Sequence, residues 1–354
     1  MERRRYLRAA GLAAATGLAG CGILRTERRS TRSPPLVEDR PDAVYYPTHV
    51  EGMNVVGTAD AGPYRVALTY SYPHRFWTVT GDEASITRIE ADDSVHLMAQ
   101  VWDPETGTVL PDTGLDLEVT RDGDLVSQEV IYPMLSQPMG VHYGGNFALA
   151  GDGTYDVTVS VGALSGSGVR RAGPFRDRFA DPGEATVEFP YSQAARDDIA
   201  YRLLERAGQR GAVDRMDMAA APTGVAPTEA TLPGDVRATA TTGDAVLVVS
   251  LLDSPPAGVA GERYLAVSAR TPYNRLVLPA MALSGTLARG DETVFEGSLA
   301  RTLDPDLGYH YGAAVPSVAA GDSLALTVET PPQVARHEGY ETAFLEMGPV
   351  EVTL

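Results

Sequence analysis

An internal repeat constrains this chain more than any other feature of its sequence. When the sequence is shifted by 168 residues against itself, identical residues fall in one register, including an unbroken His-Tyr-Gly at 142–144 and 310–312. The eleven identical pairs are Pro104/Pro272, Val109/Val277, Leu110/Leu278, Pro111/Pro279, Leu115/Leu283, Arg121/Arg289, Gly140/Gly308, His142/His310, Tyr143/Tyr311, Gly144/Gly312 and Gly153/Gly321. So many identities in register are hard to obtain by chance, so we interpret the chain as a degenerate duplication whose halves share one fold.

Each half has the pattern of an all-β domain. Short alternating or β-branched runs are separated by Gly, Pro and Asp clusters, and Asp122-Gly123 marks a hairpin between two of them. The run GDGTYDVTVSV resembles the penultimate strand of an immunoglobulin-like sandwich, with Tyr155 in the corner position. The predicted strands are 64–72, 94–102, 115–120, 125–131 and 154–161, repeated as 245–252, 264–269, 282–287, 293–299 and 323–329. The sequence therefore predicts an all-β fold of two tandem immunoglobulin-like antiparallel β-sandwiches.

A short helix and a linker are expected between the two sandwiches. Ser192 can cap a helix running from Gln193 to about Ala207, and an Ala/Pro/Thr-rich stretch follows it. The expected organisation is a signal peptide at 1–20, a lipid-anchored tether at 21–42, a first β-sandwich at 43–191, a helix and linker at 192–234, and a second β-sandwich at 235–354.

The N-terminus reads as an export signal. Arg3-Arg4, followed by Arg5 and Arg8, matches the twin-arginine pattern, and a short small-residue apolar stretch comes next. The stretch ends in Leu-Ala-Gly before Cys21, which resembles the cleavage motif of lipoproteins, and Cys21 is the one cysteine in the sequence. We therefore expect lipidation of Cys21 and a protein held at the extracellular face of the cell membrane.

Composition narrows the classes of function. The net charge is −18 and none of the 29 basic residues is a lysine, so nucleic acid is not an expected partner. An acidic chain without lysine is typical of extreme halophiles, although a GC-rich genome also replaces Lys by Arg. The sequence lacks a Walker loop, a dinucleotide fingerprint, an HExxH motif and a nucleophile elbow. We therefore expect a protein that is not an enzyme.

One segment combines soft and borderline metal ligands. Residues 133–144 read PMLSQPMGVHYG, so Met134, Met139 and His142 lie close together along the chain. Thioethers and imidazole suit Cu(I) or Cu(II), and imidazole also suits Fe(II). Further possible ligands lie at 49–53 (HVEGM) and at His74. The alternative from the residues alone is that these histidines and methionines only pack within the sandwich.

These motifs resemble a known family, the periplasmic ferrous-iron transport accessory proteins. The resemblance lies in QEVIYPMLSQPMGVHYGGNFAL with GDGTYDVTVSV, in FEGSLARTLDPDLGYHYGAAV, and in the Pro-Pro followed by Arg336-His337. It implies an immunoglobulin-like fold that binds copper or iron. The tandem arrangement with its lipoprotein motif also resembles a haloarchaeal lipoprotein family.

The resemblance implies ligands that come from both halves. His142 and His310 take the place of the family's loop histidine, Met134 that of its thioether, and His337 and His74 those of two further histidines. The family's early His-x-Glu pair is missing from the segment YRVALTYSYPHRF. The second half has Thr302 near the methionine position, and the first has Arg170-Arg171 in place of Arg-His. Neither half keeps a whole set, so the halves either pool ligands, as subunits of the family's dimers do, or have lost binding.

The sequence thus leads to one functional expectation and one alternative. We expect a lipid-anchored cell-surface protein that binds copper or iron as a non-catalytic accessory to membrane metal transport. A metal permease is then a possible partner, and the tandem domains replace a homodimer. The alternative is a structural or interaction lipoprotein with immunoglobulin-like domains and a decayed metal site.

Overall fold

The computed structural model describes residues 34–354, which belong to one compact unit. The expected signal peptide, Cys21 and the start of the tether lie outside the described residues. The prediction of an all-β chain with antiparallel sheets is confirmed, because strands make up nearly all of the regular structure. No helix in the described part is both long enough and apolar enough to cross a membrane.

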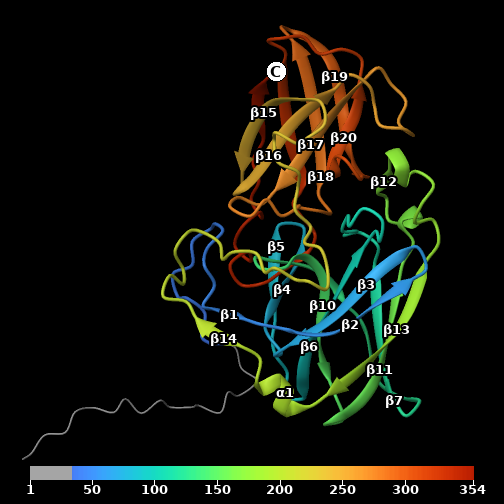
Figure 1. Ribbon diagram of the computed structural model, residues 1–354. Coiled ribbons are helices and arrows are strands. Elements are labelled where there is room, and N and C mark those ends of the chain that lie inside the picture. Colours follow the sequence, from blue (N-terminus) through green and yellow to red (C-terminus); the bar gives the residue numbers. More distant parts are fainter. Residues whose placement is uncertain (1–33) are drawn as a thin grey trace, which may run out of the picture. The chain divides into compact units, whose positions relative to one another are not determined.

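The first half folds into two large sheets (Figure 1). An eight-stranded sheet has the order β2-β3-β6-β10-β9-β22-β4-β5, and a four-stranded sheet has the order β13-β11-β7-β8. The bounds are β2 (Asn54–Ala61), β3 (Tyr64–Ser71), β4 (Phe76–Thr80), β5 (Glu83–Thr87), β6 (Asp93–Trp102), β7 (Leu115–Arg121), β8 (Asp124–Val130), β9 (Tyr132–Ser136), β10 (Gly140–Ala148), β11 (Gly153–Val161), β13 (Gly183–Tyr191) and β22 (Ala335–Arg336).

The second half forms one nine-stranded arrangement. Its path is β15-β16-β17-β20-β19-β18-β21-β23, and the long strand β19 pairs with both β20 and β18. The bounds are β15 (Asp235–Thr242), β16 (Ala245–Leu252), β17 (Arg263–Arg270), β18 (Ala282–Arg289), β19 (Glu292–Asp304), β20 (Gly308–Val315), β21 (Ser323–Thr330) and β23 (Val350–Thr353). The ninth strand, β12 (Arg170–Arg171), pairs with β19.

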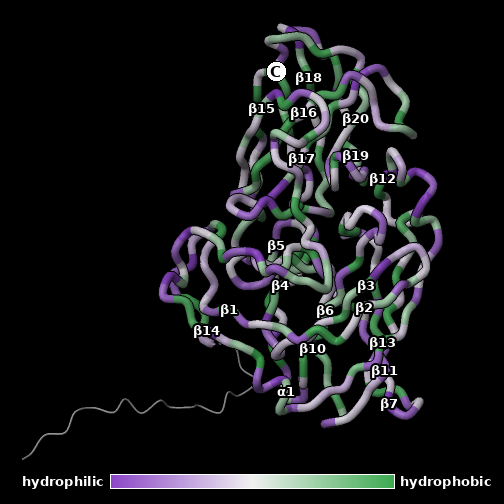
Figure 2. The backbone as a smooth tube through the Cα atoms, viewed as in Figure 1, coloured by the Kyte–Doolittle hydropathy of each residue, from purple (hydrophilic) through white to green (hydrophobic). Residues whose placement is uncertain are grey.

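Alternating burial along the strands explains why these sequences form sheets. In β11 the residues Tyr155, Val157, Val159 and Val161 are buried and alternate with partly or fully exposed ones. Each fully buried valine stabilises the fold by about 1.5–3 kcal/mol. The Tyr155 hydroxyl donates to the Gly151 carbonyl at 2.6 Å, which is the corner contact expected from the sequence. Figure 2 shows hydrophobic stretches along the strands of both halves.

The two halves repeat one topology, as the 168-residue register predicts. The order β2-β3-β6-β10-β9 in the first half corresponds to β15-β16-β17-β20-β19 in the second. Likewise β13-β11-β7-β8 corresponds to β23-β21-β18-β19, with β19 covering the positions of both β8 and β9. Strands β10 and β20 begin at Gly140 and Gly308, which are 168 residues apart. We call residues related by this register counterparts.

Each half inserts a short strand into the other half's sheet. Strand β22, from the second half of the sequence, runs parallel to β9, where Ala335 pairs with Met134. Strand β12, from the first half, runs parallel to β19, where Arg170 pairs with Thr302. Met134 and Thr302 are counterparts, so the exchange is reciprocal. It places His337, the residue after β22, beside the first half.

The predicted helix is much shorter than expected. The helix α1 covers Gln193–Asp197, not Gln193 to Ala207, although Ser192 caps it as predicted by accepting from the Ala195 amide. Residues further along form β14 (Tyr201–Leu203), which pairs with β1 (His49–Glu51). Pairing with a distant segment therefore overrides the local helical pattern. Two 3-10 turns, η1 (Leu164–Gly166) and η2 (Gly173–Phe175), complete the described elements.

Candidate metal centre

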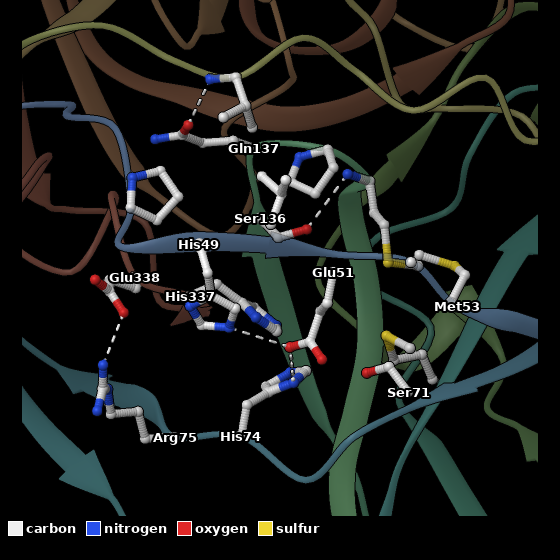
Figure 3. A pocket seen from close by; sticks show the side chains of 17 residues that line it. His49, Glu51, Met53, Ser71, His74, Arg75, Ser136, Gln137, His337 and Glu338 are labelled. Atoms are coloured by element: carbon white, nitrogen blue, oxygen red, sulfur yellow. Dashed lines mark hydrogen bonds and ion pairs between the residues drawn. The ribbon is translucent and has the colours of Figure 1, made fainter. Parts of the chain in front are cut away.

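A cavity of about 90 Å³ lies in the first half and is lined by three histidines and three methionines (Figure 3). Its walls come from β1, from the segment between β3 and β4, from β6, from the loop after β9, and from the residues after β22. The lining residues that can bind a metal are His49, Glu51, Met53, His74, Met98, Met139, His337 and Glu338.

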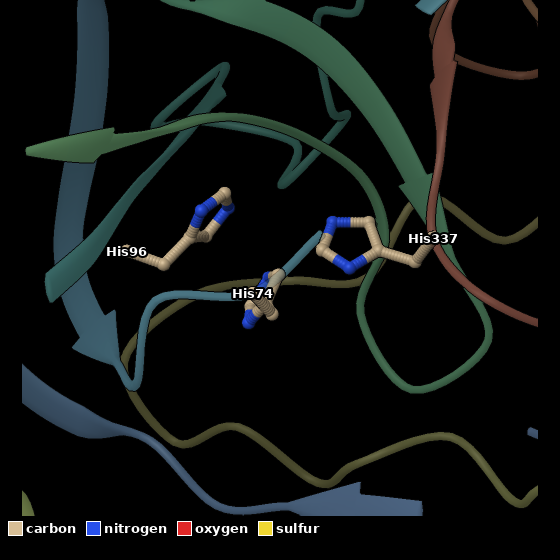
Figure 4. A group of neighbouring side chains, drawn as sticks. All are labelled: His74, His96 and His337. Atoms are coloured by element: carbon tan, nitrogen blue, oxygen red, sulfur yellow. The ribbon is translucent and has the colours of Figure 1, made fainter. Parts of the chain in front are cut away.

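Three histidines from three different segments bring their ring nitrogens together (Figure 4). One ring nitrogen each of His74, His96 and His337 lies within 4.8 Å of the other two. The Nε2 atoms of His74 and His96 are buried and make no hydrogen bond within the described part of the chain. Buried polar atoms without partners are rare and costly, so these two nitrogens have the environment expected of metal ligands.

Hydrogen bonds to the other ring nitrogen fix which nitrogen faces this space. His96 donates from Nδ1 to Asn146 Oδ1 at 2.8 Å, and His142 donates from Nδ1 to the Gly140 carbonyl at 3.0 Å. Each ring therefore keeps its Nε2 unprotonated, with a lone pair that can bind a metal, which is the usual arrangement of a metal-binding imidazole. Asn146 also contacts the backbone of His74 through both of its amide atoms, so it positions two of the histidines.

A fourth histidine adjoins the group at a distance that suits coordination. His142 Nε2 lies 3.2 Å from His337 Nε2. Two nitrogens on a tetrahedral ion with bonds of about 2.0 Å lie about 3.3 Å apart. The His142–His337 pair therefore needs almost no movement to share one ion, while the other two rings need to move closer.

Glu51 adds one carboxylate between two imidazoles. Its Oε1 lies 3.1 Å from His74 Nδ1 and 3.5 Å from His49 Nε2, as the dashed lines in Figure 3 show. Burial alone would raise the pKa of Glu51, but the hydrogen bonds and charges of His49 and His74 outweigh it and lower the pKa to about 2. Glu51 is therefore ionised near neutral pH and places a negative charge beside the histidines, which favours a cation.

The buried histidines are unprotonated near neutral pH. Burial lowers the pKa of His142 to about 4 and lowers the pKa of His96 and His337 well below the usual range. A metal ion then has no proton to displace from these rings at pH 7.

Thioethers complete the donor set. A Cβ atom placed on Gly144 would lie 2.7 Å from His96 Nε2 and 3.2 Å from Met134 Sδ, so both donor atoms flank the same small space. Met98 pairs with Gly144 across β6 and β10 and lines the cavity together with Met53 and Met139. Thioether sulfur with imidazole is a donor set that favours copper, above all Cu(I).

The second half lacks these donors at the corresponding positions. The counterparts of His96, Met98, Met134 and Met139 are Tyr264, Ala266, Thr302 and Leu307. The position of His337, whose amide donates to the Leu135 carbonyl at 3.1 Å, is taken by Ala172, whose amide donates to Leu303 at 3.0 Å. Tyr264, Ala266 and Leu307 belong to a small apolar cluster. The same fold therefore packs without metal ligands, so their presence in the first half is not a requirement of the fold.

The structure brings five of the six predicted ligands together. His74, His142 and His337 meet, Met134 adjoins them, and Met139 lines the cavity. Of these five residues, His337 comes from the second half of the sequence and the other four come from the first.

His310 is the exception among the predicted ligands. Like His142, it donates from Nδ1 to a glycine carbonyl, that of Gly308. Its Nε2, however, lies 3.0 Å from the Tyr264 hydroxyl. Its ring is therefore satisfied by protein groups in the second half and does not contribute to the cluster around His337.

Sequence reasoning missed two residues and undervalued two others. His96 and Met98 lie on one face of β6, two residues apart, but a histidine and a methionine within a buried strand carry no distinctive signal. A His-x-Glu pair, which the segment YRVALTYSYPHRF lacks, is present upstream as His49-Val50-Glu51. From the sequence, this upstream segment was only a further possible source of ligands. The pairing of β1 with β14 holds it at the cavity.

We expect Gly144→Ala to obstruct the centre without unfolding the chain. The added methyl group would lie 2.7 Å from His96 Nε2, closer than real contacts of this kind, so the imidazole must shift away from its neighbours. Copper affinity should fall by about tenfold or more, measured by competition with a chromophoric chelator. Gly285→Ala in β18, where the methyl group meets only side chains at 3.6 Å or more, serves as the control. Equal affinities for both variants would contradict this arrangement.

Comparisons with known proteins cover parts of the chain. A family model described as a domain of unknown function, DUF7350, matches residues 230–353. No curated protein matches the chain.

Solved structures that resemble the chain include FetP of uropathogenic Escherichia coli strain F11, expressed in the periplasm. The match has 20% identity and a TM-score of 0.31, and it covers 40% of this chain and 96% of FetP. A copper-bound variant of FetP matches at 20% identity and a TM-score of 0.31, over 39% of this chain and 97% of the variant. The copper in that structure is bound to the FetP variant.

Proposed function

We propose that this chain binds one copper ion, as cargo, at the His74–His96–His142–His337 cluster. The observation that supports this most strongly is the convergence of imidazole nitrogens without partners, next to a thioether, in one half of a duplicated fold. The other half fills the equivalent space with apolar side chains. Selection for packing alone would not favour buried nitrogens without hydrogen bonds.

Copper fits the donors better than iron does. Four imidazoles and the Met134 thioether suit Cu(I), whereas iron sites of this kind use more carboxylate oxygen. Two carboxylates, those of Glu51 and Glu338, line the cavity. His49 and His74 already contact Glu51, and Arg75 pairs with Glu338 at 2.9 Å. Fe(II) therefore enters as the competing ion in the test.

The proposed role is that of a non-catalytic accessory to membrane metal transport. Ligands that surround a buried ion on several sides suit reversible holding of the ion more than reaction at it. The twin-arginine pattern and the motif at Cys21 support an exported protein tethered by lipid to the outer face of the membrane. A metal permease in that membrane is the partner that this placement suggests.

Metal titration of the purified chain tests the proposal. Cu(I), under anaerobic conditions, Cu(II) and Fe(II) are titrated in turn against a competing chelator. We expect one tight equivalent of Cu(I) per chain and weaker Fe(II) binding. Tighter binding of Fe(II) than of Cu(I) would overturn the choice of metal. Binding no tighter than that of an exposed imidazole would overturn metal binding and leave the structural or interaction lipoprotein.

A further inference from the structure

A second cavity, of about 430 Å³, lies in the second half at the end of β17. None of its lining residues lines the proposed copper site. Two arginines and a short apolar wall define its chemistry. The lining residues are Thr228, Glu229, Ala230, Val246, Val248, Arg270, Thr271, Pro272, Tyr273 and Arg275.

Arg270 is buried in this wall with much of its guanidinium unsatisfied. Only 3% of the residue is exposed, and its Nη1 donates to the Pro227 carbonyl at 2.7 Å. Its Nε and Nη2 atoms are buried and make no hydrogen bond in the described part of the chain. Burial lowers the pKa of Arg270 to about 10, so the group is still charged at pH 7. A buried charge with free donors is costly unless something pairs with it.

The protein itself supplies little compensation for this charge. Arg275 lines the same cavity and adds a second positive charge, and its Nη1 donates only to the Ala226 carbonyl. The one carboxylate in the lining, that of exposed Glu229, accepts from Thr239 at 3.0 Å and forms no ion pair with either arginine among the described contacts. The cavity is therefore a positive site on a chain whose net charge is −18.

The fold does not require an arginine at this position. The counterpart of Arg270 is Trp102, which packs in an apolar cluster with Ala67 and Val109. The counterpart of Thr271 is Asp103, which forms an ion pair with Arg178. At this strand end, the first half therefore has a packed aromatic ring and a paired carboxylate. The second half has the unpaired guanidinium donors of Arg270 beside a cavity.

We propose that this cavity binds the oxyanion group of a small organic molecule, a carboxylate or a phosphate. Adjacent N–H groups of a guanidinium bind two oxygens of such a group side by side, and Nε and Nη2 of Arg270 are adjacent and free. Arg275 adds charge from a second direction. Val246, Val248 and Tyr273 provide an apolar wall for the rest of the molecule. The cavity volume lies within the range of small-molecule sites.

Binding of defined probes to the purified, metal-free chain tests this site independently of copper binding. The probes are benzoate, phenyl phosphate and inorganic phosphate, with benzylamine as a cationic counterpart, measured by calorimetry and by thermal shift. We expect benzoate or phenyl phosphate to bind and raise the melting temperature, and benzylamine to do neither. The stronger of the two identifies the oxyanion, and inorganic phosphate reports the contribution of the head group alone.

Two variants separate the site from general surface charge. Arg270→Met keeps the length of the side chain and removes its charge and donors, so probe affinity should fall about 10- to 100-fold. Arg263→Gln alters another arginine of β17, one paired with Asp253, and should leave affinity unchanged. If Arg270→Met fails to fold, Arg275→Gln tests the second charge and should lower affinity by a smaller factor. No probe binding by the unaltered chain, or equal binding by Arg270→Met, would overturn the proposal.

Discussion

Replacing His142 by alanine is expected to weaken Cu(I) binding by about 100-fold or more, whereas His310→Ala should leave it unchanged. His142 brings its Nε2 to within 3.2 Å of His337 Nε2, so its loss removes a ligand. His310, its counterpart, directs Nε2 to Tyr264 and has no part in the cluster. Loss of a group that only orients a ligand typically costs 10- to 100-fold in metal affinity, and loss of the ligand itself costs at least as much. Competition titration with a Cu(I) chelator measures both variants.

The two substitutions form a matched pair. Both imidazoles are about 1% exposed and both donate from Nδ1 to a glycine carbonyl at 3.0 Å, so the structural cost of removing either ring should be similar. A difference in affinity therefore reports coordination and not loss of packing. Similar affinities for the two variants would contradict the proposed centre. His337→Ala should match His142→Ala, because its ring lies in the same cluster.

Arg336→Ala is expected to lower the free energy of unfolding by about 3–5 kcal/mol. Arg336 is fully buried and donates to three carbonyl oxygens, those of Pro332, Val334 and Ala343. Truncation leaves three buried acceptors without a donor and opens a cavity beneath β22. Urea denaturation of the metal-free protein at fixed pH measures the change. Cu(I) affinity should fall as well, because the next residue is His337.

Arg171→Ala provides the control for this experiment. Arg171 of β12 pairs with Leu303 of β19, just as Arg336 of β22 pairs with Leu135 of β9. Arg171 is only partly buried, however, and donates to one carbonyl, that of Arg178. Its removal should cost about 1 kcal/mol. A loss as large as that for Arg336→Ala would show that the difference in burial and hydrogen bonding is not what matters at these two strands.

The repeat made much of the fold predictable, because the strands of β2-β3-β6-β10-β9 and of β13-β11-β7-β8 have equivalents in the second half, whereas the β4-β5 hairpin has none. The short strand β14 was not predictable, since residues 193–207 carry a helical apolar pattern and the competing partner, β1, lies about 150 residues earlier. The exchange of β12 and β22 was not predicted, because the family resemblance suggested only that the halves pool ligands or have lost binding. No local pattern marks a two-residue strand whose pairing is set by a distant edge.

Likewise, only some residues of the candidate site could be predicted from the sequence. Met134, Met139 and His142 were predictable because they share one segment, and His74 and His337 were predictable from the resemblance. His96 was not predictable, because only its neighbours in the folded structure distinguish a metal-binding histidine in a buried strand from one that merely packs there. Arg270 is similar, since its free donors follow from the geometry of the cavity and not from any motif.

The exchange of short strands has a consequence for how this protein responds to dilution. When a binding centre is assembled from two separate subunits, lowering the protein concentration separates the ligands and releases the ion. Here His337 and the other three histidines belong to one polypeptide, so their effective concentration is fixed by the chain. Covalent linkage also frees the halves to evolve separately, because a substitution in one copy is no longer imposed on both. Tyr264 and Thr302 could thus replace the ligands of the second copy while the first copy kept its own.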